Sequence, residues 1–338
     1  MFFPIFLSRK EVMKRNVIID CDPGIDDSLA LLYALQHPDL EVIALTIVAG
    51  NVPVDLGVEN ACKVLERLNR LDIPIYAGAA QPLVRDFVSA QDTHGMDGLG
   101  ETYFARTSDK GAEEQEASHF LAQFFSEPQD VSIIALGPLT NIAQALQLNP
   151  ALGQHLERFV SMGGSYKSHG NCSPVAEYNY WCDPHAAQFV YQNLGQTIEM
   201  VGLDVTREIV LTPNLLEYMR LLNPEVADFI GQITRFYWDF HWKYEHIIGC
   251  VINDPLAVAH FIHADLCQGF ESSTEVVTEG IALGQTVVDA ADFYHRPANS
   301  LILTSVDVKQ FFTDFLARIL QVETDVIQAD LQEGGCLS

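Results

Sequence analysis

The stretch NVIIDCDPGIDD, residues 16–27, runs from a continuous apolar segment directly into a cluster of aspartates. Residues 16–21 are predicted to form a buried strand, because an unbroken Val/Ile run fits a strand that is covered on both faces. Similar runs alternate with helical periodicity along the chain, which predicts an α/β fold with a mainly parallel central sheet flanked by helices and joined by right-handed crossovers. The further predicted strands are 41–49, 73–76 and 131–136, and the predicted helices are 26–36, 55–69 and one that starts at Pro138.

The second half of the chain contains a long predicted helix, residues 224–248, that is dense in aromatic side chains. Most of these side chains are expected in the core or in a subunit contact, and a minority can reach a planar ligand. Strands at 287–289 and 300–303 are expected to complete the sheet, and a helix at 307–320 is expected to cover it. The aromatic residues of the long helix are Phe229, Phe236, Tyr237, Trp238, Phe240, Trp242 and Tyr244.

The domain organisation is predicted to be simple, because the 338 residues contain no internal repeat, low-complexity tract or Gly/Ser linker. We expect one domain over residues 15–325, a dispensable N-terminal extension over 1–14 and a C-terminal tail over 326–338. No apolar run approaches the roughly 18 residues that a membrane-spanning helix needs.

The composition restricts the partners and the compartment. With 19 Lys and Arg against 45 Asp and Glu, the formal net charge is -26, so nucleic acid and anionic membrane surfaces are not expected as partners. Most of this charge has a bland explanation, an acidic coat that keeps the protein soluble, although it also suits a site for a divalent cation. The seven cysteines form no CxxC pair, which favours free thiols in a reducing cytoplasm.

Four carboxylates, Asp20, Asp22, Asp26 and Asp27, lie where the first predicted strand ends. Ligands of open parallel sheets bind beyond the carboxyl ends of the strands. Carboxylates this close together repel one another unless a cation lies among them, and hard cations such as calcium or magnesium prefer oxygen ligands. The alternative is purely structural, with Asp26 capping the next helix and Asp20 bonding the loop backbone.

Two further polar groups occur farther along the chain. Glu177 and Asn179 flank one residue in the loop GNCSPVAEYN (170–179), so an extended segment would point both to one side, where a carboxylate and an amide can hold vicinal hydroxyls. Asp254 precedes the apolar helix LAVAHFI, where it is either a ligand or only an acid at a helix start.

Together these pieces resemble the inosine–uridine-preferring nucleoside hydrolase family from about residue 16 to the end of the chain. DCDPGIDD (20–27) is similar to the family signature, and the other family motifs follow in the family's order. The resemblance implies the single-domain nucleoside hydrolase fold with a Rossmann-like core, a homodimer or homotetramer, and a role in cytoplasmic nucleoside salvage. The matching motifs are TIVAGN (46–51), HGMDGLG (94–100), GPLTNIA (137–143), MGGS (162–165), GNCSPVAEYN (170–179), GLDVT (202–206) and NDPLAVA (253–259).

The resemblance also implies an activity and a set of site residues. The expected reaction is hydrolysis of the N-glycosidic bond of a ribonucleoside to ribose and free base, by a calcium-activated water with Asp22 as the base. Calcium (Ca2+) would be bound by Asp22, Asp27, Asp254 and the backbone carbonyl of Leu136. The ribose hydroxyls would be contacted by Asp26, Asn51, Glu177 and Asn179, and the 5′-hydroxyl by Asn171.

The sequence departs from the family at Asn253, where many members have a histidine that protonates the leaving base. An amide donates hydrogen bonds but delivers no proton near neutral pH. Three histidines are candidates to replace it: His94 in the HGMDGLG loop, and His241 and His246 on the aromatic helix. The resulting hypothesis is that Asn253 holds the base while His94 supplies or relays the proton. The sequence leaves the preferred base open and suggests a shift towards pyrimidines as one possibility.

Two rival functions are weighed against this one. The spacing Asp20-x-Asp22 after a buried strand resembles the nucleophile loop of magnesium-dependent haloacid-dehalogenase-type phosphatases, but Pro23-Gly24-Ile25 replaces the usual Gly and Thr. The non-enzyme alternative is a calcium-dependent ribose or nucleoside binder that lost catalysis through Asn253.

Overall fold

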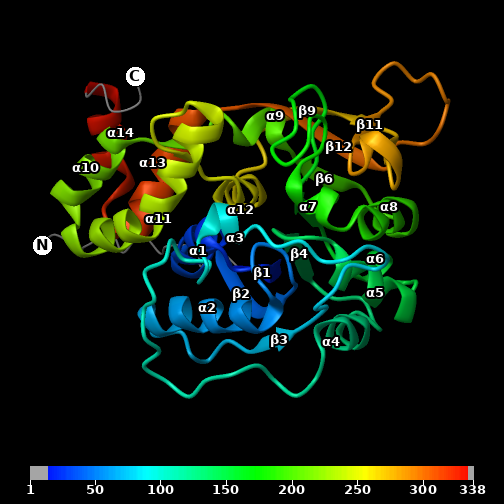
Figure 1. Cartoon of the computed structure of the whole chain (residues 1–338), viewed down its shortest axis with the longest axis horizontal. Helices are drawn as coiled ribbons and strands as arrows, with labels where there is room; N and C mark the ends of the chain where they lie inside the picture. Colours follow the sequence, from blue (N-terminus) through cyan, green and yellow to red (C-terminus); the bar gives the residue numbers. More distant parts are fainter. Residues whose placement is uncertain (1–13, 334–338) are drawn as a thin grey trace, which may run out of the picture.

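The computed structural model describes residues 14–333, in which the largest sheet has eight strands in the spatial order β3-β2-β1-β4-β5-β6-β12-β9 (Figure 1). Its strands pair in parallel except for β9, which runs antiparallel to β12 at one edge. This confirms the mainly parallel sheet. The strands are β1 (Arg15–Cys21), β2 (Leu40–Ile47), β3 (Ile75–Ala77), β4 (Val131–Ala135), β5 (Phe159–Met162), β6 (Ile198–Val201), β9 (Cys267–Ser272) and β12 (Ser300–Val306).

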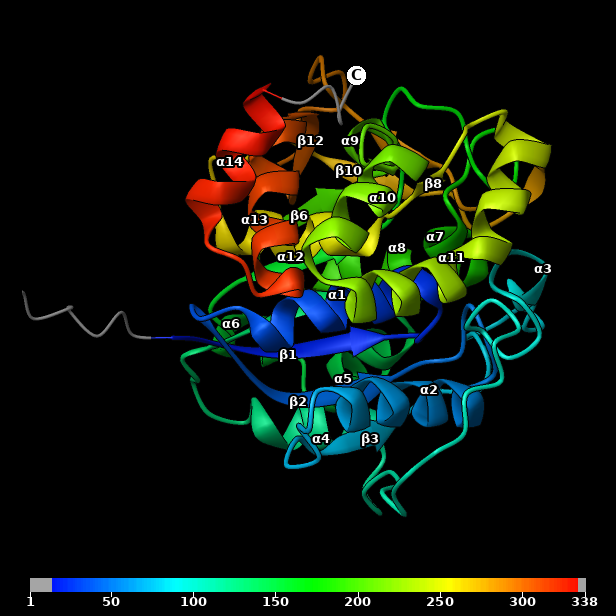
Figure 2. The ribbon, with the colours of Figure 1, turned by 90° about the vertical axis from the view of Figure 1, so that its left-hand side faces the viewer.

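Helices cover both faces of this sheet, and successive side chains of β1 contribute to both cores. Val17 and Ile19 pack in the cluster that includes α1, α2, α12 and α13, whereas Ile18 packs in the cluster that includes α4, α5 and α8. Figure 2 shows α1, α11 and α12 together on one side of β1. The helices are α1 (Ile25–Gln36), α2 (Val54–Arg67), α3 (Gln91–His94), α4 (Ala117–Phe124), α5 (Thr140–Leu148), α6 (Leu152–His155), α7 (Tyr178–Cys182), α8 (Pro184–Asn193), α9 (Leu203–Thr206), α10 (Pro213–Leu222), α11 (Pro224–Glu245), α12 (Asp254–Ile262), α13 (Val308–Leu320) and α14 (Thr324–Glu333).

The segment at residues 287–289 does not complete the central sheet as predicted. It belongs to β11 (Thr286–Val288), which pairs antiparallel with β10 (Thr274–Val276) in a separate two-stranded sheet. The hydroxyl of Thr286 accepts a hydrogen bond from the amide of Ser165 and donates one to its carbonyl. These bonds hold β11 against the loop after β5. The other predicted strand, 300–303, lies in the central sheet as part of β12.

The long aromatic helix is present as α11 but ends at Glu245, before the predicted end at residue 248. His246 adopts a left-handed conformation with φ 57° and caps the helix through its amide, which donates to the His241 carbonyl. The chain then enters β8 (Cys250–Val251), which pairs antiparallel with β7 (Val210–Leu211). This short ladder fixes the backbone immediately before Asn253 and Asp254.

The two ends of the chain bear on the predicted domain limits. The expected extension falls almost entirely outside the described residues, which begin at Lys14. The expected tail is helical over its described part, which belongs to α14. This helix packs on the fold through the buried side chains of Ile327 and Leu331. Between residues 14 and 333, none of the helices combines the length and apolarity that crossing a membrane requires.

An ion-pair cluster around Glu199 on β6 is expected to make the stability of the fold sensitive to acid. Glu199 on β6 accepts hydrogen bonds from the Arg158 guanidinium and from His260 Nε2, the latter at 2.7 Å, and its side chain is 14 % exposed. Burial alone would raise the pKa of Glu199, but these bonds outweigh burial and lower the pKa to about 2. A lowered pKa stabilises the fold above the unfolded-state value of 4.5, and this contribution is lost as the pH falls towards about 2.

We therefore expect Glu199→Gln to reduce the free energy of unfolding by roughly 3 kcal/mol near neutral pH. The difference from the wild type should shrink as the pH falls from 4.5 towards about 2. Urea unfolding at a series of pH values measures this, with the exposed Glu271→Gln as the matched control. A pH-independent difference would contradict the assignment.

Candidate active site

The predicted site residues meet at the carboxyl ends of β1, β2 and β4. Here the connections that follow neighbouring strands run over opposite faces of the sheet. β1 and β4 are neighbours, yet the chain leaves β1 through α1 on one face and leaves β4 through α5 on the other. A crevice opens between such diverging connections, which is where ligands of doubly wound sheets bind. Parallel pairing therefore brings together residues that are more than one hundred positions apart, such as Asp20 and Ala135.

Asp22 lies at the bottom of this crevice and is fully buried. Its Oδ2 accepts a hydrogen bond of 2.7 Å from the Asn51 amide, whereas Oδ1 is buried without a hydrogen-bond partner. Two glycines make room for the carboxylate, since a Cβ on Gly50 would lie 2.0 Å from Oδ2 and one on Gly137 would lie 2.5 Å from Oδ1. The motifs TIVAGN and GPLTNIA therefore each supply the glycine that this carboxylate needs.

Asp27 and Asp26 project from the first turn of α1. Asp27 accepts hydrogen bonds from the amides of Asp22 and Gly24, at 3.1 and 3.0 Å, and from Asn51 Nδ2 at 2.9 Å. Asp26 Oδ2 accepts from Asn253 Nδ2 at 3.0 Å. Oxygen atoms of Asp26, Asp27 and Asp254 all lie within 4.8 Å of one another. This buried group contains two of the three aspartates expected to bind calcium, together with Asp26, which was assigned to the ribose.

The crowding of these carboxylates shows in their pKa values. Burial, with Coulombic repulsion from Asp27 second, raises the pKa of Asp22 well above its usual range. Burial and the neighbouring Asp26 raise the pKa of Asp27 to about 6, and burial and the other three aspartates also raise that of Asp254. A cation among them would favour the ionised forms. Asp20 lies outside this group, because its Oδ1 accepts from Thr46 and Asn141 in the interior.

One wall of the pocket comes from the loop before α7. Glu177 caps α7, with its carboxylate accepting from the amides of Gly164, Asn179 and Tyr180 at 2.8–3.2 Å. Burial raises the pKa of Glu177 to about 7 despite these bonds. Asn179 Nδ2 donates to the Leu136 carbonyl at 2.7 Å, and exposed Asn171 also lines the pocket. Asn179 thus reaches the end of β4, and Glu177 reaches the loop after β5.

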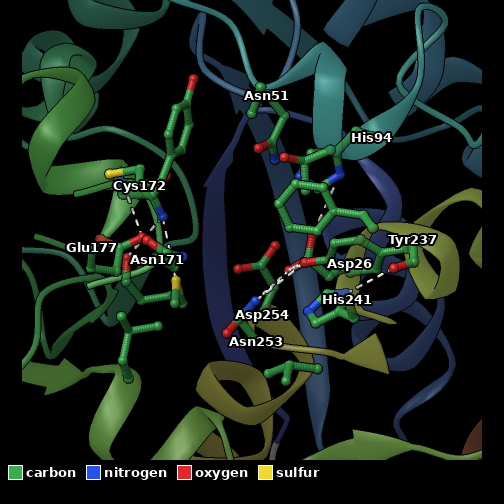
Figure 3. A pocket seen from close by; sticks show the side chains of 18 of the residues that line it. Asp26, Asn51, His94, Asn171, Cys172, Glu177, Tyr237, His241, Asn253 and Asp254 are labelled. Atoms are coloured by element: carbon green, nitrogen blue, oxygen red, sulfur yellow. Dashed lines mark hydrogen bonds and ion pairs between the residues drawn. The ribbon is translucent and has the colours of Figure 1, made fainter. Parts of the chain in front are cut away.

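The facing wall is formed by α3, α11 and the residues after β8 (Figure 3). The Tyr237 hydroxyl lies 3.4 Å from both Asp26 Oδ2 and Asn253 Nδ2, and its ring centroid lies 5.2 Å from that of His94 and 4.4 Å from that of His241. Asn253 Oδ1 is buried without a hydrogen-bond partner. Aromatic and imidazole rings on this wall suit a planar ring, opposite the residues that the sequence predicts to bind hydroxyls.

The structure brings most of the predicted site residues together around this one pocket. Asp26, Asn51, His94, Leu136, Asn171, Glu177, Asn179, His241, Asn253 and Asp254 line it, with Asp22 and Asp27 directly beneath.

His246 is the exception, because it is exposed, does not line the pocket and contacts the Trp242 ring. The left-handed turn that ends α11 directs the chain away from the pocket at this residue.

Eleven of the residues that line the pocket were not assigned to the site from the sequence, and three of them carry the arguments below: Tyr237, Arg207 and Glu245. Tyr237 was grouped with the aromatic core residues of the long helix, although its spacing of four from His241 places both on one helix face. Arg207 directly follows the GLDVT motif, which was the available signal for it. Glu245 carried no signal in the sequence, since its role depends on the position at which α11 ends. Arg207 and Glu245 both line the pocket.

Comparisons with known proteins agree with this geometry. The family model described as inosine-uridine preferring nucleoside hydrolase matches residues 17–313. A pyrimidine-specific ribonucleoside hydrolase from Shewanella oneidensis is 36 % identical over 91 % of this chain and 96 % of its own length. A probable uridine nucleosidase from Oryza sativa is 33 % identical over 83 % of this chain and 87 % of its own.

Solved structures give the same answer for the fold. A purine-preferring ribonucleoside hydrolase from Gardnerella vaginalis superposes with a TM-score of 0.84 and 31 % identity, covering 93 % of this chain and 99 % of that one. A plant nucleoside hydrolase superposes with a TM-score of 0.86 and 30 % identity, covering 90 % and 99 %. The phosphatase alternative has no support in these matches. The chain belongs to the inosine–uridine-preferring nucleoside hydrolase family and is a ribonucleoside hydrolase, an N-glycosyl hydrolase of the α/β class.

Proposed function

We propose that the pocket hydrolyses the N-glycosidic bond of ribonucleosides with Asp22 as the base for the attacking water, and that Asp22, Asp27, Asp254 and the Leu136 carbonyl hold a calcium ion. The observation that carries this proposal is the buried Asp22 Oδ1, which has no hydrogen-bond partner although it lies among three other carboxylates. Leaving a buried carboxylate oxygen unpaired is costly, so a cation bound at Oδ1 would stabilise the site.

The donor set fits a hard divalent cation. The atoms available are carboxylate, amide and backbone carbonyl oxygens, without a cysteine or histidine ligand in the group of Asp26, Asp27 and Asp254. Calcium accepts six to eight such oxygens in a flexible arrangement. When bound, the cation orients ribose hydroxyls and lowers the pKa of water. Asp22, which approaches the site from below, accepts the proton that the water loses as it attacks C1′.

The ribose is held by groups that also favour the transition state. Asp26, Asn51, Glu177 and Asn179 bind its hydroxyls, and Asn171 binds the 5′-hydroxyl. Cleavage of the glycosidic bond builds positive, oxocarbenium-like charge on the sugar. Surrounding carboxylates stabilise that charge more than they stabilise the neutral substrate, so they increase the rate and not only the affinity.

His94 is poorly arranged to protonate the leaving base, contrary to our hypothesis from the sequence. Its Nδ1 accepts a hydrogen bond of 3.1 Å from the Ile25 amide, so the ring proton is on Nε2 and a second proton on Nδ1 would face that N–H. Burial also lowers the pKa of His94, although Asp26 opposes this. We expect neutral His94 to donate a hydrogen bond through Nε2.

His241 is better arranged for this role. Its Nδ1 lies 2.9 Å from the Tyr237 carbonyl, which can only accept, so Nδ1 carries a proton and Nε2 remains for the base. Burial lowers the pKa of His241 overall, while the bond to the Tyr237 carbonyl and the carboxylates of Glu245 and Asp26 favour its charged form and Arg207 opposes them. We infer that His241 protonates the base, while Asn253 holds Asp26 in place through Nδ2.

The expected base preference rests on the names of the relatives. We expect pyrimidine nucleosides to be preferred, because two of the most similar curated relatives carry the names pyrimidine-specific ribonucleoside hydrolase and uridine nucleosidase. The structure from Gardnerella vaginalis is named purine-preferring. The preference of this protein is therefore tested directly by comparing pyrimidine and purine nucleosides. Assembly as a homodimer or homotetramer stays a prediction, which light scattering on the purified protein would test.

The test is ribose and free base released from inosine, adenosine, uridine and cytidine, each supplied to the purified protein with added calcium. We expect equimolar ribose and base, with uridine and cytidine ahead of the purine nucleosides in kcat/KM. Saturable nucleoside binding without ribose from any of the four would instead support the binder alternative.

A further inference from the structure

The short segment Gly202–Arg207, which contains α9, holds both ends of the loop that leads to Asn171. Asp204 accepts hydrogen bonds from three successive amides, those of Tyr166, Lys167 and Ser168, at 2.6, 2.7 and 3.0 Å. Three residues later, Arg207 contacts the other end of this loop. A carboxylate that accepts several backbone N–H bonds is a strong anchor, so α9 fixes the start of the loop rigidly.

Arg207 holds the residue immediately before Asn171. Its Nη2 donates to the Gly170 carbonyl at 3.1 Å, and its Nη1 donates to His169 Nε2 at 2.8 Å. Because a guanidinium only donates, His169 carries its proton on Nδ1, which lies 2.8 Å from the same Gly170 carbonyl. The amide of Asn171 then donates to the Ala176 carbonyl at 3.1 Å. These bonds fix the backbone of Asn171 while its side chain remains exposed to the pocket.

Arg207 also reaches the opposite wall. Its Nη2 lies 3.6 Å from Oε1 of Glu245, the last residue of α11, and the two side chains are only 20 % and 17 % exposed. Both line the pocket, and Arg207 Nε is buried without a hydrogen-bond partner. Shielding from solvent strengthens such a pair relative to a surface ion pair. The ion pair thus joins the loop of Asn171 to the helix that carries His241.

We propose that Arg207 is a positioning residue for recognition of the nucleoside 5′-hydroxyl, acting through Gly170 on Asn171, and that its ion pair with Glu245 couples this recognition to the wall that binds the base. The proposal rests on the function proposed above. Arg207 is assigned no part in the chemical step, because its guanidinium bonds Gly170 and His169 and pairs with Glu245.

The decisive comparison uses two substrates, uridine and 5′-deoxyuridine, which differ only in the hydroxyl concerned. We expect Arg207→Gln to lower kcat/KM for uridine about tenfold, the scale of one hydrogen bond to substrate, and to change that for 5′-deoxyuridine less than about twofold. Asn171→Ala should show the same selectivity. In the Asn171→Ala background, Arg207→Gln should cause no further loss, because both changes remove one interaction.

Two further variants separate positioning from folding. Glu245→Gln weakens the ion pair with Arg207 and also removes a carboxylate that favours charged His241, so kcat/KM should fall on both substrates, with uridine losing about threefold more than 5′-deoxyuridine. Arg207→Lys keeps the charge but cannot serve Gly170 and His169 together, and should fall between the wild type and Arg207→Gln. Arg220→Gln, which removes a partly exposed arginine that also pairs with two carboxylates, is the matched control and should leave both substrates unaffected.

The outcomes are distinguishable. Equal losses on uridine and 5′-deoxyuridine, or additive losses in the double variant, would overturn the positioning role, and a normal thermal midpoint would show that the fold is not the cause. If Arg207→Gln does not fold, Glu245→Gln and Arg207→Lys decide the question by the same substrate comparison. Absence of ribose release by the wild type would instead refute the proposed function itself.

Discussion

Replacing Asp22 with asparagine is expected to lower kcat for nucleoside hydrolysis by about 10³-fold or more, because the amide can neither accept the proton of the attacking water nor bind a cation as a carboxylate does. The change is nearly isosteric, and isostericity matters here because Gly50 and Gly137 pack directly against both carboxylate oxygens. The fold should therefore remain intact, and the loss should lie in the chemistry.

The same substitution should stabilise the protein when divalent cations are removed. Asp22 is buried next to Asp27, and both burial and this neighbour raise its pKa. Removing a charge-bearing group from such a cluster relieves repulsion, so Asp22→Asn should raise the thermal midpoint in chelator while it abolishes activity. Asp20→Asn is the matched control: Asp20 is equally buried and lies on β1, two residues before Asp22, but its Oδ1 bonds interior side chains. We expect Asp20→Asn to keep kcat within about threefold, and an equal loss in both variants would contradict the assignment of Asp22.

The second large effect is expected at His241. His241→Gln should lower kcat for uridine by about 10²-fold, within the usual range for general acid catalysis, because glutamine can hydrogen-bond the base but cannot protonate it. His94→Gln should cost less, since the neutral His94 ring offers only a hydrogen bond from Nε2. Steady-state kinetics of both variants on uridine measure the difference.

A substrate with a better leaving group makes this test specific. p-Nitrophenyl riboside releases a phenolate that needs no proton, so a general acid contributes little to its hydrolysis. His241→Gln should therefore hydrolyse p-nitrophenyl riboside at nearly the wild-type rate while it remains impaired on uridine. A comparable loss on both substrates would show that His241 acts in binding or folding, and a larger uridine-specific loss in His94→Gln would restore His94 as the acid.

The parts of the site that follow directly from strand ends were predictable from the sequence. Asp22, Asn51 and Leu136 come immediately after buried apolar runs, and parallel pairing places the ends of such runs at one edge of the sheet. The motif resemblance then supplied the residues that we propose to bind the metal and the ribose. The central sheet was predictable for the same reason, because strands covered on both faces have continuous apolar sequences.

The parts that depend on how individual segments end were not predictable. His246 was assigned to the substrate, but α11 ends at Glu245 and His246 itself adopts the left-handed conformation. This turn directs His246 away from the pocket and leaves Glu245 close to Arg207. The strand at residues 286–288 pairs with β10 and not with the central sheet. This pairing could not be predicted, because a short alternating segment carries no information about its partner strand. The roles of His94 and His241 depend on which backbone group each Nδ1 faces, and a sequence does not contain that information.

The measurement that tests the account most directly is ribose release from uridine by protein stripped of divalent cations with a chelator, followed by titration with calcium. We predict that stripping lowers the rate by at least about 100-fold and that calcium restores it with saturation, because Asp22 and Asp27 lie directly beneath the pocket that Asp254 lines, and burial and neighbouring carboxylates raise the pKa of all three. Undiminished ribose release in the continued presence of the chelator would contradict the metal site, and with it the assignment of these aspartates.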